Sequence, residues 1–242
     1  MASVRNQTYE AVELVVVAPP QNGPQTALAA RIEGVRRSHG KYVTFVDADD
    51  WLDDHAVEDM VAAIGSAEIL CTGLIRGSKV LYPSQDIWAC GPGAVFNAMC
   101  GKLFRRDVLA DLKLDLLIQM GEDLELVAQA LHRAHSVATA NIAVYHYRNN
   151  PSSLTHKLDG RRRVLDLVRV GALLRKAMPE SRYDDFHDRV TRDAMLLWIR
   201  HRVGDRNLWR ELRARLKGGL LSDPRHGFIK KGALFCASRL FD

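Results

Sequence analysis

The chain has 242 residues, of which 47% are hydrophobic and 26% charged, and its formal net charge is +5 at pH 7. This balance is typical of a folded protein with a sizeable core and excludes a disordered or low-complexity chain. No apolar run approaches the roughly 18 residues of a membrane span, and the first residues lack the pattern of a secretory signal. The four cysteines form no CxxC pair and have no histidine at zinc-site spacing, which favours ordinary thiols in the cytoplasm over zinc or disulfides.

The charge is distributed unevenly along the chain. Residues 1–156 contain 13 basic and 18 acidic side chains, whereas residues 157–242 contain 21 basic and 11 acidic ones. A basic C-terminal region is typical of proteins that meet an anionic surface, either a membrane or a nucleic acid. A solvated helical face explains the same excess equally well.

The first part of the chain alternates strand and helix signals. The β-branched run Glu13–Val17, closed by Ala18-Pro19-Pro20, predicts a buried strand. A helix is expected over 25–37, a second buried strand over 42–46 and a further helix over 53–64. This order favours a mostly parallel sheet with helices on its faces, which binds ligands at the carboxyl ends of its strands.

Further along, the patterns predict a short helix near 105–112, a clear helix over 122–134 and a strand over 142–147. The remainder of the chain is largely helical in pattern and rich in arginine. We therefore expect two regions, an α/β domain over 1–156 and a basic, mainly helical region over 157–242.

A cluster of acids follows the strand predicted at 42–46. Asp47, Asp49 and Asp50 stand where the carboxyl end of that strand is expected. Carboxylates two residues apart can converge on one divalent cation, and hard oxygen ligands suit Mg²⁺ or Mn²⁺, especially when a diphosphate adds further oxygens. The alternative interpretation is a set of acids that cap the next helix. We expect Trp51 to pack beneath this acidic loop.

Several segments resemble, in the right order, those of the inverting family 2 glycosyltransferases. The stretch 40–52, with its Asp-Ala-Asp-Asp sequence, resembles the DxD segment of that family. The other segments that resemble the family are Asn6–Val17 with its NQTY lead-in to a strand, Ala29–Gly34, Gly101–Arg106, Gly121–Leu124, Tyr145–Arg148 and Ser152–His156. The resemblance covers residues 5–156, and several motifs in order are far more specific than any one alone.

This resemblance implies a GT-A-like fold: a Rossmann-like, mostly parallel sheet flanked by helices, here with a C-terminal helical extension. It also implies a nucleoside-diphosphate sugar as donor, bound with Mg²⁺ or Mn²⁺. Asp47 would lie near the donor ribose or the metal, Asp49 would be the direct metal ligand, and His156 would be a further ligand. Arg31 and Arg148 would bind the donor, and Arg148 and His156 would neutralise the leaving diphosphate.

By the same resemblance, Glu122 and Asp123 match the catalytic acid pair of the family. Asp123 would be the general base that deprotonates an acceptor hydroxyl while that hydroxyl attacks the anomeric carbon in line. Taken without the resemblance, the pair is explained as negative charge at the N-terminus of the 122–134 helix, where the helix dipole favours it.

The sequence departs from the family pattern near its N-terminus. The family's first strand and its nucleotide-binding loop have no counterpart, because the chain starts at the lead-in to the second strand. The acid that ends the second strand is replaced by Ala18-Pro19-Pro20, and the connection over 21–28 is short. Either Val15–Val17 fills the vacant central position, or another chain does. In an alternative alignment, Leu14–Pro19 is the family's first strand, with the next two strands deleted.

Three hypotheses of function follow. The first is an inverting glycosyltransferase acting on a glycan, a lipid-linked sugar or a protein, with its basic region against the inner face of a membrane and its oligomeric state left open. The second is a non-catalytic scaffold or partner subunit, favoured by Ala18-Pro19-Pro20 and opposed by the retained Asp47, Asp49 and Asp123. The third, a nucleic-acid-binding protein, has least support because no recognised motif or interleaved aromatic residues accompany the arginines.

Overall fold

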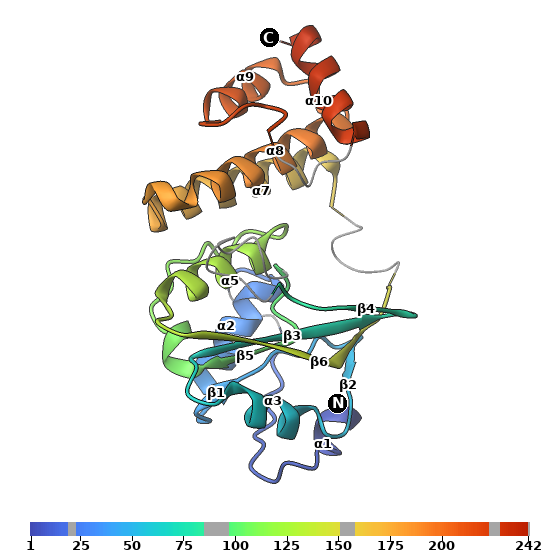
Figure 1. Ribbon diagram of the computed structural model, residues 1–242, viewed down its shortest axis with the longest axis vertical. Coiled ribbons are helices and arrows are strands. Elements are labelled where there is room, and N and C mark those ends of the chain that lie inside the picture. The colour runs from blue at the N-terminus through green and yellow to red at the C-terminus, as the bar shows by residue number, and fades with distance from the viewer. Residues whose placement is uncertain (19–22, 85–96, 151–157, 223–227, 242) are drawn as a thin grey trace. The chain divides into compact units, whose positions relative to one another are not determined.

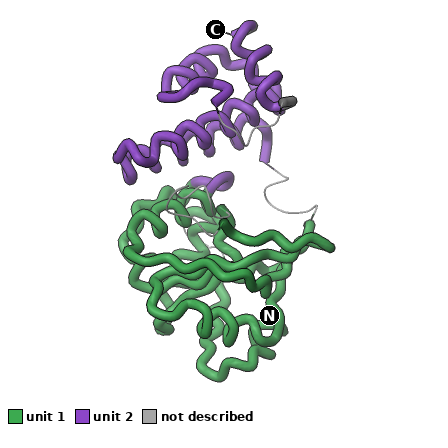
Figure 2. Tube along the Cα trace, in the orientation of Figure 1, with its two compact units in different colours: residues 1–117, 122–152 green, residues 118–121, 153–242 purple. Residues whose placement is uncertain are grey.

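The computed structural model describes residues 1–18, 23–84, 97–150, 158–222 and 228–241. It divides into two compact units, drawn in Figure 2. The sheet unit comprises Met1–Leu117 and Glu122–Ser152, and the helical unit comprises Ile118–Gly121 and Ser153–Asp242. Each unit is described by itself below.

The sheet unit is built on a mixed sheet (Figure 1). Among the described residues it has six strands in the order β1-β5-β3-β6-β2, with β4 paired to β3. The strands are β1 (Tyr42–Val43), β2 (Trp51–Leu52), β3 (Ile69–Arg76), β4 (Lys79–Leu81), β5 (Lys102–Arg105) and β6 (Val137–Tyr147). Within this part of the chain, β3 and β6 pair in parallel and the other pairs are antiparallel.

The expectation of a mostly parallel sheet is therefore wrong in the strand directions, although the α/β class is correct. Parallel neighbours need a long crossover, and the connection from β3 to β6 is of this kind, since it contains β4, β5 and α5 (Glu122–Arg133). Elsewhere the chain turns back on itself. Gly77, at φ +59°, lies in the tight turn that joins β3 to β4 and makes that pair antiparallel.

Helices cover both faces of the sheet. On one face, α2 (Ala27–Arg37) and α5 contribute Leu28, Leu126 and Val127 to a buried cluster with Ile69 and Phe104. On the other face, α3 (Ala56–Ile64) is buried against Leu70, Leu74, Leu103 and Tyr145. Successive residues of β3 point to opposite faces, so this strand, buried from Ile69 to Leu74, joins the two clusters.

The strand predicted at Glu13–Val17 is not present. This run has no regular structure, and the side chains of Leu14 and Val16 are 38% and 62% exposed. The carboxylate of Glu13 accepts hydrogen bonds from the backbone N–H and the ring of His39, which follows α2. Apolar, β-branched residues form a strand only when a neighbouring strand offers backbone partners, and here the run instead contacts His39, just after the end of α2. The structure therefore contradicts both expected placements of this run, as the central strand and, in the alternative alignment, as the first strand of the sheet.

The other expectations differ mainly in extent. The short helix predicted near 105–112 is a 3₁₀ helix over Arg106–Leu109. The strand predicted over 42–46 is assigned for Tyr42–Val43, and the strand predicted over 142–147 begins earlier, at Val137. The short α1 (Ala2–Arg5) and the strands β3, β4 and β5 were not predicted from the sequence.

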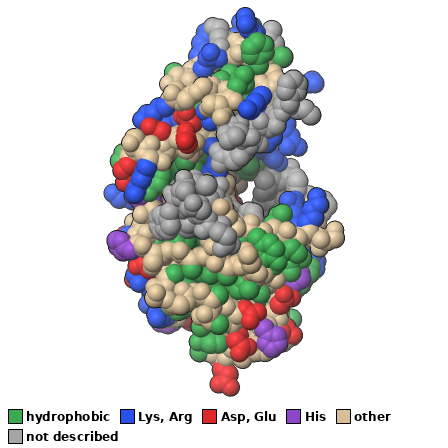
Figure 3. Space-filling model, viewed as in Figure 1, with side chains coloured by type: hydrophobic (Ala, Val, Ile, Leu, Met, Phe, Trp, Pro, Cys, Tyr) green, Lys and Arg blue, Asp and Glu red, His purple; other side chains and the backbone are tan. Residues whose placement is uncertain are grey.

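The helical unit consists of α7 (Gly160–Ala177), a 3₁₀ turn (Ser181–Tyr183), α8 (Asp184–Arg200), α9 (Arg206–Ala214) and α10 (Phe228–Phe241). Segment Ile118–Gly121 belongs to it: the Gln119 N–H donates to the Asp166 carboxylate of α7 at 3.0 Å. Lys and Arg side chains are frequent on its surface (Figure 3). Among the described helices, none combines the length and apolar character that a membrane crossing requires.

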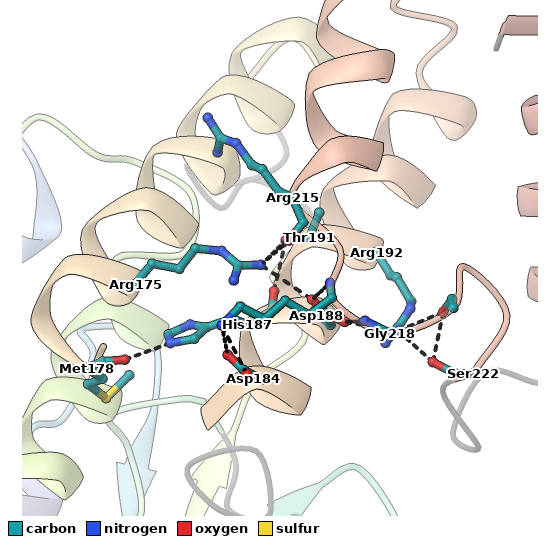
Figure 4. A network of polar contacts seen from close by, with 12 residues as sticks. Arg175, Met178, Asp184, His187, Asp188, Thr191, Arg192, Arg215, Gly218 and Ser222 are labelled. Atoms are coloured by element: carbon teal, nitrogen blue, oxygen red, sulfur yellow. Dashed lines mark hydrogen bonds and ion pairs between the residues drawn. The ribbon is translucent and has the colours of Figure 1, made fainter. Parts of the chain in front are cut away.

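A buried acid of α8 organises this unit (Figure 4). Asp188 is 1% exposed, and its carboxylate accepts hydrogen bonds from the backbone N–H groups of Lys217 and Gly218. The guanidinium groups of Arg175 and Arg192 lie 3.5 Å and 3.6 Å from the same carboxylate. A buried charge is tolerated when it is paired and hydrogen-bonded in this way. Asp188 therefore ties α7, α8 and the chain after α9 together.

We expect Asp188→Asn to lower the free energy of unfolding by about 3 kcal/mol, because it leaves two guanidinium groups without their buried counter-charge. Urea denaturation followed by far-ultraviolet circular dichroism measures the loss. The control is Asp185→Asn, at an exposed position on the first turn of the same helix, which should cost less than about 1 kcal/mol. Equal losses for the two variants would contradict a special role for Asp188.

Candidate active site

The guanidinium of Arg31 is the centre of the site in the sheet unit. One Arg31 nitrogen lies 2.7 Å from Asp47 Oδ1, and the other lies 3.0 Å from Asp123 Oδ1 and 4.0 Å from Glu122 Oε1. The Arg31 side chain is 14% exposed. Burial by itself lowers the pKa of this guanidinium, but Asp123 and Asp47 outweigh it and raise the pKa above its ordinary value. Arg31 therefore remains charged while it joins the acidic loop to the start of α5.

Local sequence places Arg31 there. The Thr26 hydroxyl caps α2 by accepting a hydrogen bond from the Ala29 N–H at 3.1 Å, and it donates to the Leu116 carbonyl at 2.7 Å. Leu28, fully buried in the core, fixes the rotation of the helix. Residues three positions apart lie on the same face of a helix, so the Arg31 side chain points to the same inner side as Leu28.

The acidic loop is supported by the end of β6. The Tyr145 hydroxyl donates to Asp50 Oδ2 at 2.6 Å and accepts a hydrogen bond from the Asp47 N–H at 3.2 Å. The backbone N–H of Arg148 donates to Asp50 Oδ1 at 2.8 Å. Burial raises the pKa of the Asp50 carboxyl, although Tyr145 and the Arg148 N–H oppose it. Asp50 is thus a structural acid that fixes the loop carrying Asp47 and Asp49.

Glu122 and Asp123 begin α5. Burial, reinforced by the neighbouring Asp123, raises the pKa of Glu122 to about 7. Burial also raises the pKa of Asp123, although the Arg31 guanidinium opposes that rise. The Met99 N–H donates to Asp123 Oδ2 at 3.3 Å and orients this carboxylate. Carboxyl groups with raised pKa are stronger bases near neutral pH, which is what general-base chemistry requires.

The structure brings most of the predicted residues together. Arg31, Asp47, Glu122 and Asp123 meet directly, and Asp49 is adjacent in the loop, where its Oδ2 accepts a hydrogen bond from the Asn150 amide at 2.8 Å. Their roles as catalytic, donor-binding or metal-binding groups remain predictions.

Two other predicted features lie elsewhere. The Arg148 guanidinium lies over the Trp51 ring, 5.5 Å from its centroid. Trp51 is 40% exposed and stacks on the His146 ring, so the expectation that it packs beneath the acidic loop is wrong. The pairing of β2 with β6 turns Trp51 outward and Leu52 into the core. His156 lies outside the described residues.

Sequence reasoning missed the roles of Tyr145 and Asn150 and the burial of Lys102. Lys102 lies in the segment Gly101–Arg106 that resembles the family, where a contact with an acceptor or phosphate and a solvated helix start are equally good expectations, but it lies in β5 and is 1% exposed. Its position directly before Leu103 and Phe104, in a short run without turn residues, is the signal for a strand. A lysine inside a buried strand then indicates a polar environment within the core.

The metal expected at Asp47, Asp49 and His156 has an incomplete set of protein ligands in the described part of the chain. No group of three or more His, Cys, Asp and Glu side chains is arranged there to hold an ion. Asp47 is paired with Arg31, whereas Asp49 has a neutral amide as its partner. Asp49 is therefore the better-suited carboxylate, provided that a bound diphosphate supplies further oxygens.

We expect the stability of the protein to fall as pH rises from about 4.5 to about 7, because the folded state holds the Glu122 proton more tightly than the unfolded chain, whose ordinary pKa is 4.5. Glu122→Gln removes this contribution. It should leave stability little changed at pH 4.5 and raise it by on the order of 3 kcal/mol above pH 7.

Chemical denaturation at several pH values measures this difference. Asp59→Asn, which changes an exposed acid on α3, is the control and should reproduce the wild-type pH profile. A constant difference in stability between wild type and Glu122→Gln at every pH would contradict the assignment.

Comparison with known sequences agrees with the resemblance noted above. Residues 20–86 match the family model described as glycosyl transferase family 2. The putative glycosyltransferase EpsH of Bacillus subtilis (strain 168) is 25% identical over 199 residues, covering 65% of this chain and 58% of EpsH. The minor teichoic acid biosynthesis protein GgaB of the same organism is 24% identical over 153 residues, covering 55% of this chain and 16% of GgaB.

The chain thus corresponds to little more than half of one relative and to a small part of the other. The alignment with EpsH has 199 positions, but it includes only 65% of the 242 residues of this chain. The remaining positions of the alignment are EpsH residues that have no counterpart here.

Solved structures show the same type of fold. S. aureus TarS 1–349 in complex with UDP-GlcNAc matches with a TM-score of 0.57 at 12% identity, covering 85% of this chain and 64% of that one. S. aureus TarS 1–349 without that ligand also gives 0.57, over 82% and 63% of the two chains. Residues 20–86 of this chain are therefore similar in sequence to the family 2 glycosyltransferases, and the chain has a GT-A-like α/β fold similar to that of the TarS structures.

Proposed function

We propose that this chain transfers a sugar from a nucleoside-diphosphate sugar to a hydroxyl acceptor with inversion at the anomeric carbon. The observation that supports this most directly is the Arg31 bridge, which holds Asp47 of the acidic loop and Asp123 of α5 around one guanidinium. These are the residues that the resemblance assigns to donor binding and to base catalysis.

In this proposal Asp123 is the general base. Its carboxylate takes the proton of the acceptor hydroxyl as the hydroxyl oxygen attacks the anomeric carbon, and the bond from that carbon to the nucleoside diphosphate breaks. Burial makes the Asp123 carboxylate more basic, and Arg31 keeps it ionised and oriented. Glu122, with its pKa near 7, stands one residue away as a second site for the proton.

A divalent cation, Mg²⁺ or Mn²⁺, fits this site through Asp49, with Asp47 beside it and His156 as a ligand suggested by the resemblance. Carboxylate oxygens are the ligands that such ions prefer, and the partner of Asp49 is a neutral amide rather than a cation. When bound, the ion would neutralise charge on the leaving diphosphate. Arg31 and Arg148 are the arginines that we assign to the donor.

The comparisons support a nucleotide-sugar donor and, through one relative's name, an acceptor of the teichoic acid type. TarS has been solved with UDP-GlcNAc, and the GgaB name refers to teichoic acid biosynthesis. We assign the sugar transfer to residues 1–156, acting on a glycan, a lipid-linked sugar or a protein in the cytoplasm. The 21 basic residues within 157–242 support contact with an anionic membrane or polymer.

One observation favours the alternative, a non-catalytic scaffold or partner subunit. Residues 10–18 form no strand, and Glu13 among them is hydrogen-bonded to His39 just after α2, so the described sheet lacks the strand that the resemblance places there. A chain without that strand requires another source of nucleotide contacts. Binding measurements decide between the two functions.

We expect one nucleoside diphosphate among UDP, GDP, dTDP and CDP to bind in the presence of Mn²⁺, measured by isothermal titration calorimetry. Asp49→Asn should weaken this binding at least about tenfold, because it removes a charged metal ligand. Asp59→Asn, on the exposed side of α3, is the matched control. No binding by any of the four nucleotides to the folded protein would favour the scaffold function.

We further expect Asp123→Asn to lower kcat by at least about 100-fold with the matching sugar donor, because the amide cannot accept the acceptor proton. Nucleotide binding should persist, since Asp123 is assigned to the acceptor side. Transfer at wild-type rates by Asp123→Asn would remove Asp123 as the base.

A further inference from the structure

A lysine is buried beside the proposed base. Lys102 of β5 is 1% exposed, and its Nζ donates a hydrogen bond of 2.6 Å to the carbonyl oxygen of Ala98. Burial lowers the pKa of this ammonium, which also interacts electrostatically with Cys71, Cys100 and Asp123. Burying an ammonium costs several kcal/mol unless polar contacts offset it. A methionine or leucine would fill the same space without that cost, so packing alone does not explain the lysine.

The carbonyl that Lys102 binds belongs to a tight turn. Ala98 to Gly101 lead into β5, and Gly101 adopts φ +67°, in the left-handed region that favours glycine. A Cβ added to Gly101 would meet Leu74 Cδ2 at 2.6 Å, so the turn is tightly enclosed. The Gly101 carbonyl accepts hydrogen bonds from the N–H and the hydroxyl of Thr72, both at 2.9 Å. The turn is thus held at both ends, by Lys102 and by Thr72.

The middle of this turn contacts the base. The Met99 N–H donates to Asp123 Oδ2, while the other oxygen of Asp123 accepts from Arg31. Two further groups act electrostatically on Asp123, namely Asp47 of the acidic loop and Lys102 of β5, and Asp123 itself acts on the neighbouring Glu122. The orientation of the Asp123 carboxylate therefore depends on the shape of the turn as well as on Arg31.

We propose that Lys102 is a positioning residue: it fixes the Ala98–Gly101 turn so that the Met99 N–H holds the Asp123 carboxylate in place for proton abstraction. This rests on the proposed function for its catalytic consequence, but the structural claim stands apart from it. Lys102 acts through Met99 and is not assigned a contact with either substrate.

The test compares Lys102→Met with wild type in two measurements. Amide hydrogen exchange followed by NMR should show the Met99 N–H exchanging at least about tenfold faster, while amides of β3 and β6 keep their protection. With the sugar donor identified, kcat should fall at least about tenfold and the donor KM should stay within about twofold.

Matched variants separate this role from general damage. Lys79→Met changes an exposed lysine of β4 and should alter neither measurement. Thr72→Val removes the hydroxyl at the other end of the turn with little change of volume, so it should speed Met99 exchange even if Lys102→Met does not fold. Asp123→Ala removes the acceptor of the Met99 N–H and shows the exchange rate of the released amide.

Unchanged Met99 exchange in folded Lys102→Met overturns the proposal, whatever its activity. A raised donor KM with an unchanged kcat also overturns it, because it would place Lys102 at the donor. If wild type transfers no sugar, the proposed function fails, and the exchange measurement alone decides whether Lys102 holds the turn.

Discussion

Three segments that are distant in the sequence meet at the guanidinium of Arg31. Nitrogen atoms of this one side chain lie 2.7 Å from Asp47 and 3.0 Å from Asp123, and the side chain is mostly buried. A buried arginine is stable only with carboxylates around it, and these carboxylates would repel one another without the arginine. The positions of α2, of the loop after β1 and of the start of α5 are therefore mutually dependent. The core on either side of β3 supplies the rigidity that this convergence requires.

The same arrangement leaves the carboxylates incompletely neutralised. Arg31 faces Glu122 as well as its two closer partners, whereas Asp50 depends on a hydroxyl and a backbone N–H. Burial raises the pKa of Glu122, Asp123 and Asp50. A site of this kind is less stable than an apolar core of the same size, yet it holds carboxylates that are basic enough for proton transfer near neutral pH. Burial of these carboxylates thus lowers the stability of the fold while it raises their basicity.

Much of the site could be predicted because its signals are local. Arg31 lies in the short segment Ala29–Gly34, and the acids that begin α5 lie in Gly121–Leu124, both of which resemble the family. The order of these motifs then indicated the fold. The pairing of Arg31 with Asp123 and the support of the loop by Tyr145 depend on contacts between residues 92 to 98 positions apart, and no local pattern encodes them.

The strands were less predictable for the same reason. Glu13–Val17 has the composition of a buried strand, but a strand requires a neighbouring strand as its partner. This run instead contacts His39, which lies just after the end of α2 in the same chain. Conversely, β3 contains Gly73, where a Cβ would meet the Leu81 carbonyl oxygen at 2.8 Å. The close approach of β4 requires glycine at this position, and in the sequence alone that glycine weakens the strand signal.

The segment Ile118–Gly121 belongs to the helical unit, although the residues on both sides of it belong to the sheet unit. Ile118 is fully buried, Gln119 is hydrogen-bonded to Asp166, and a Cβ on Gly121 would lie 3.3 Å from Leu167. The two units are therefore interleaved along the chain and cannot be separated by one cut. A recombination event that exchanged the C-terminal region of this protein for that of a relative would also have to supply a surface for these few residues, which immediately precede the acid pair. The modular inheritance common among multidomain enzymes is restricted here, and the two units are expected to diverge together.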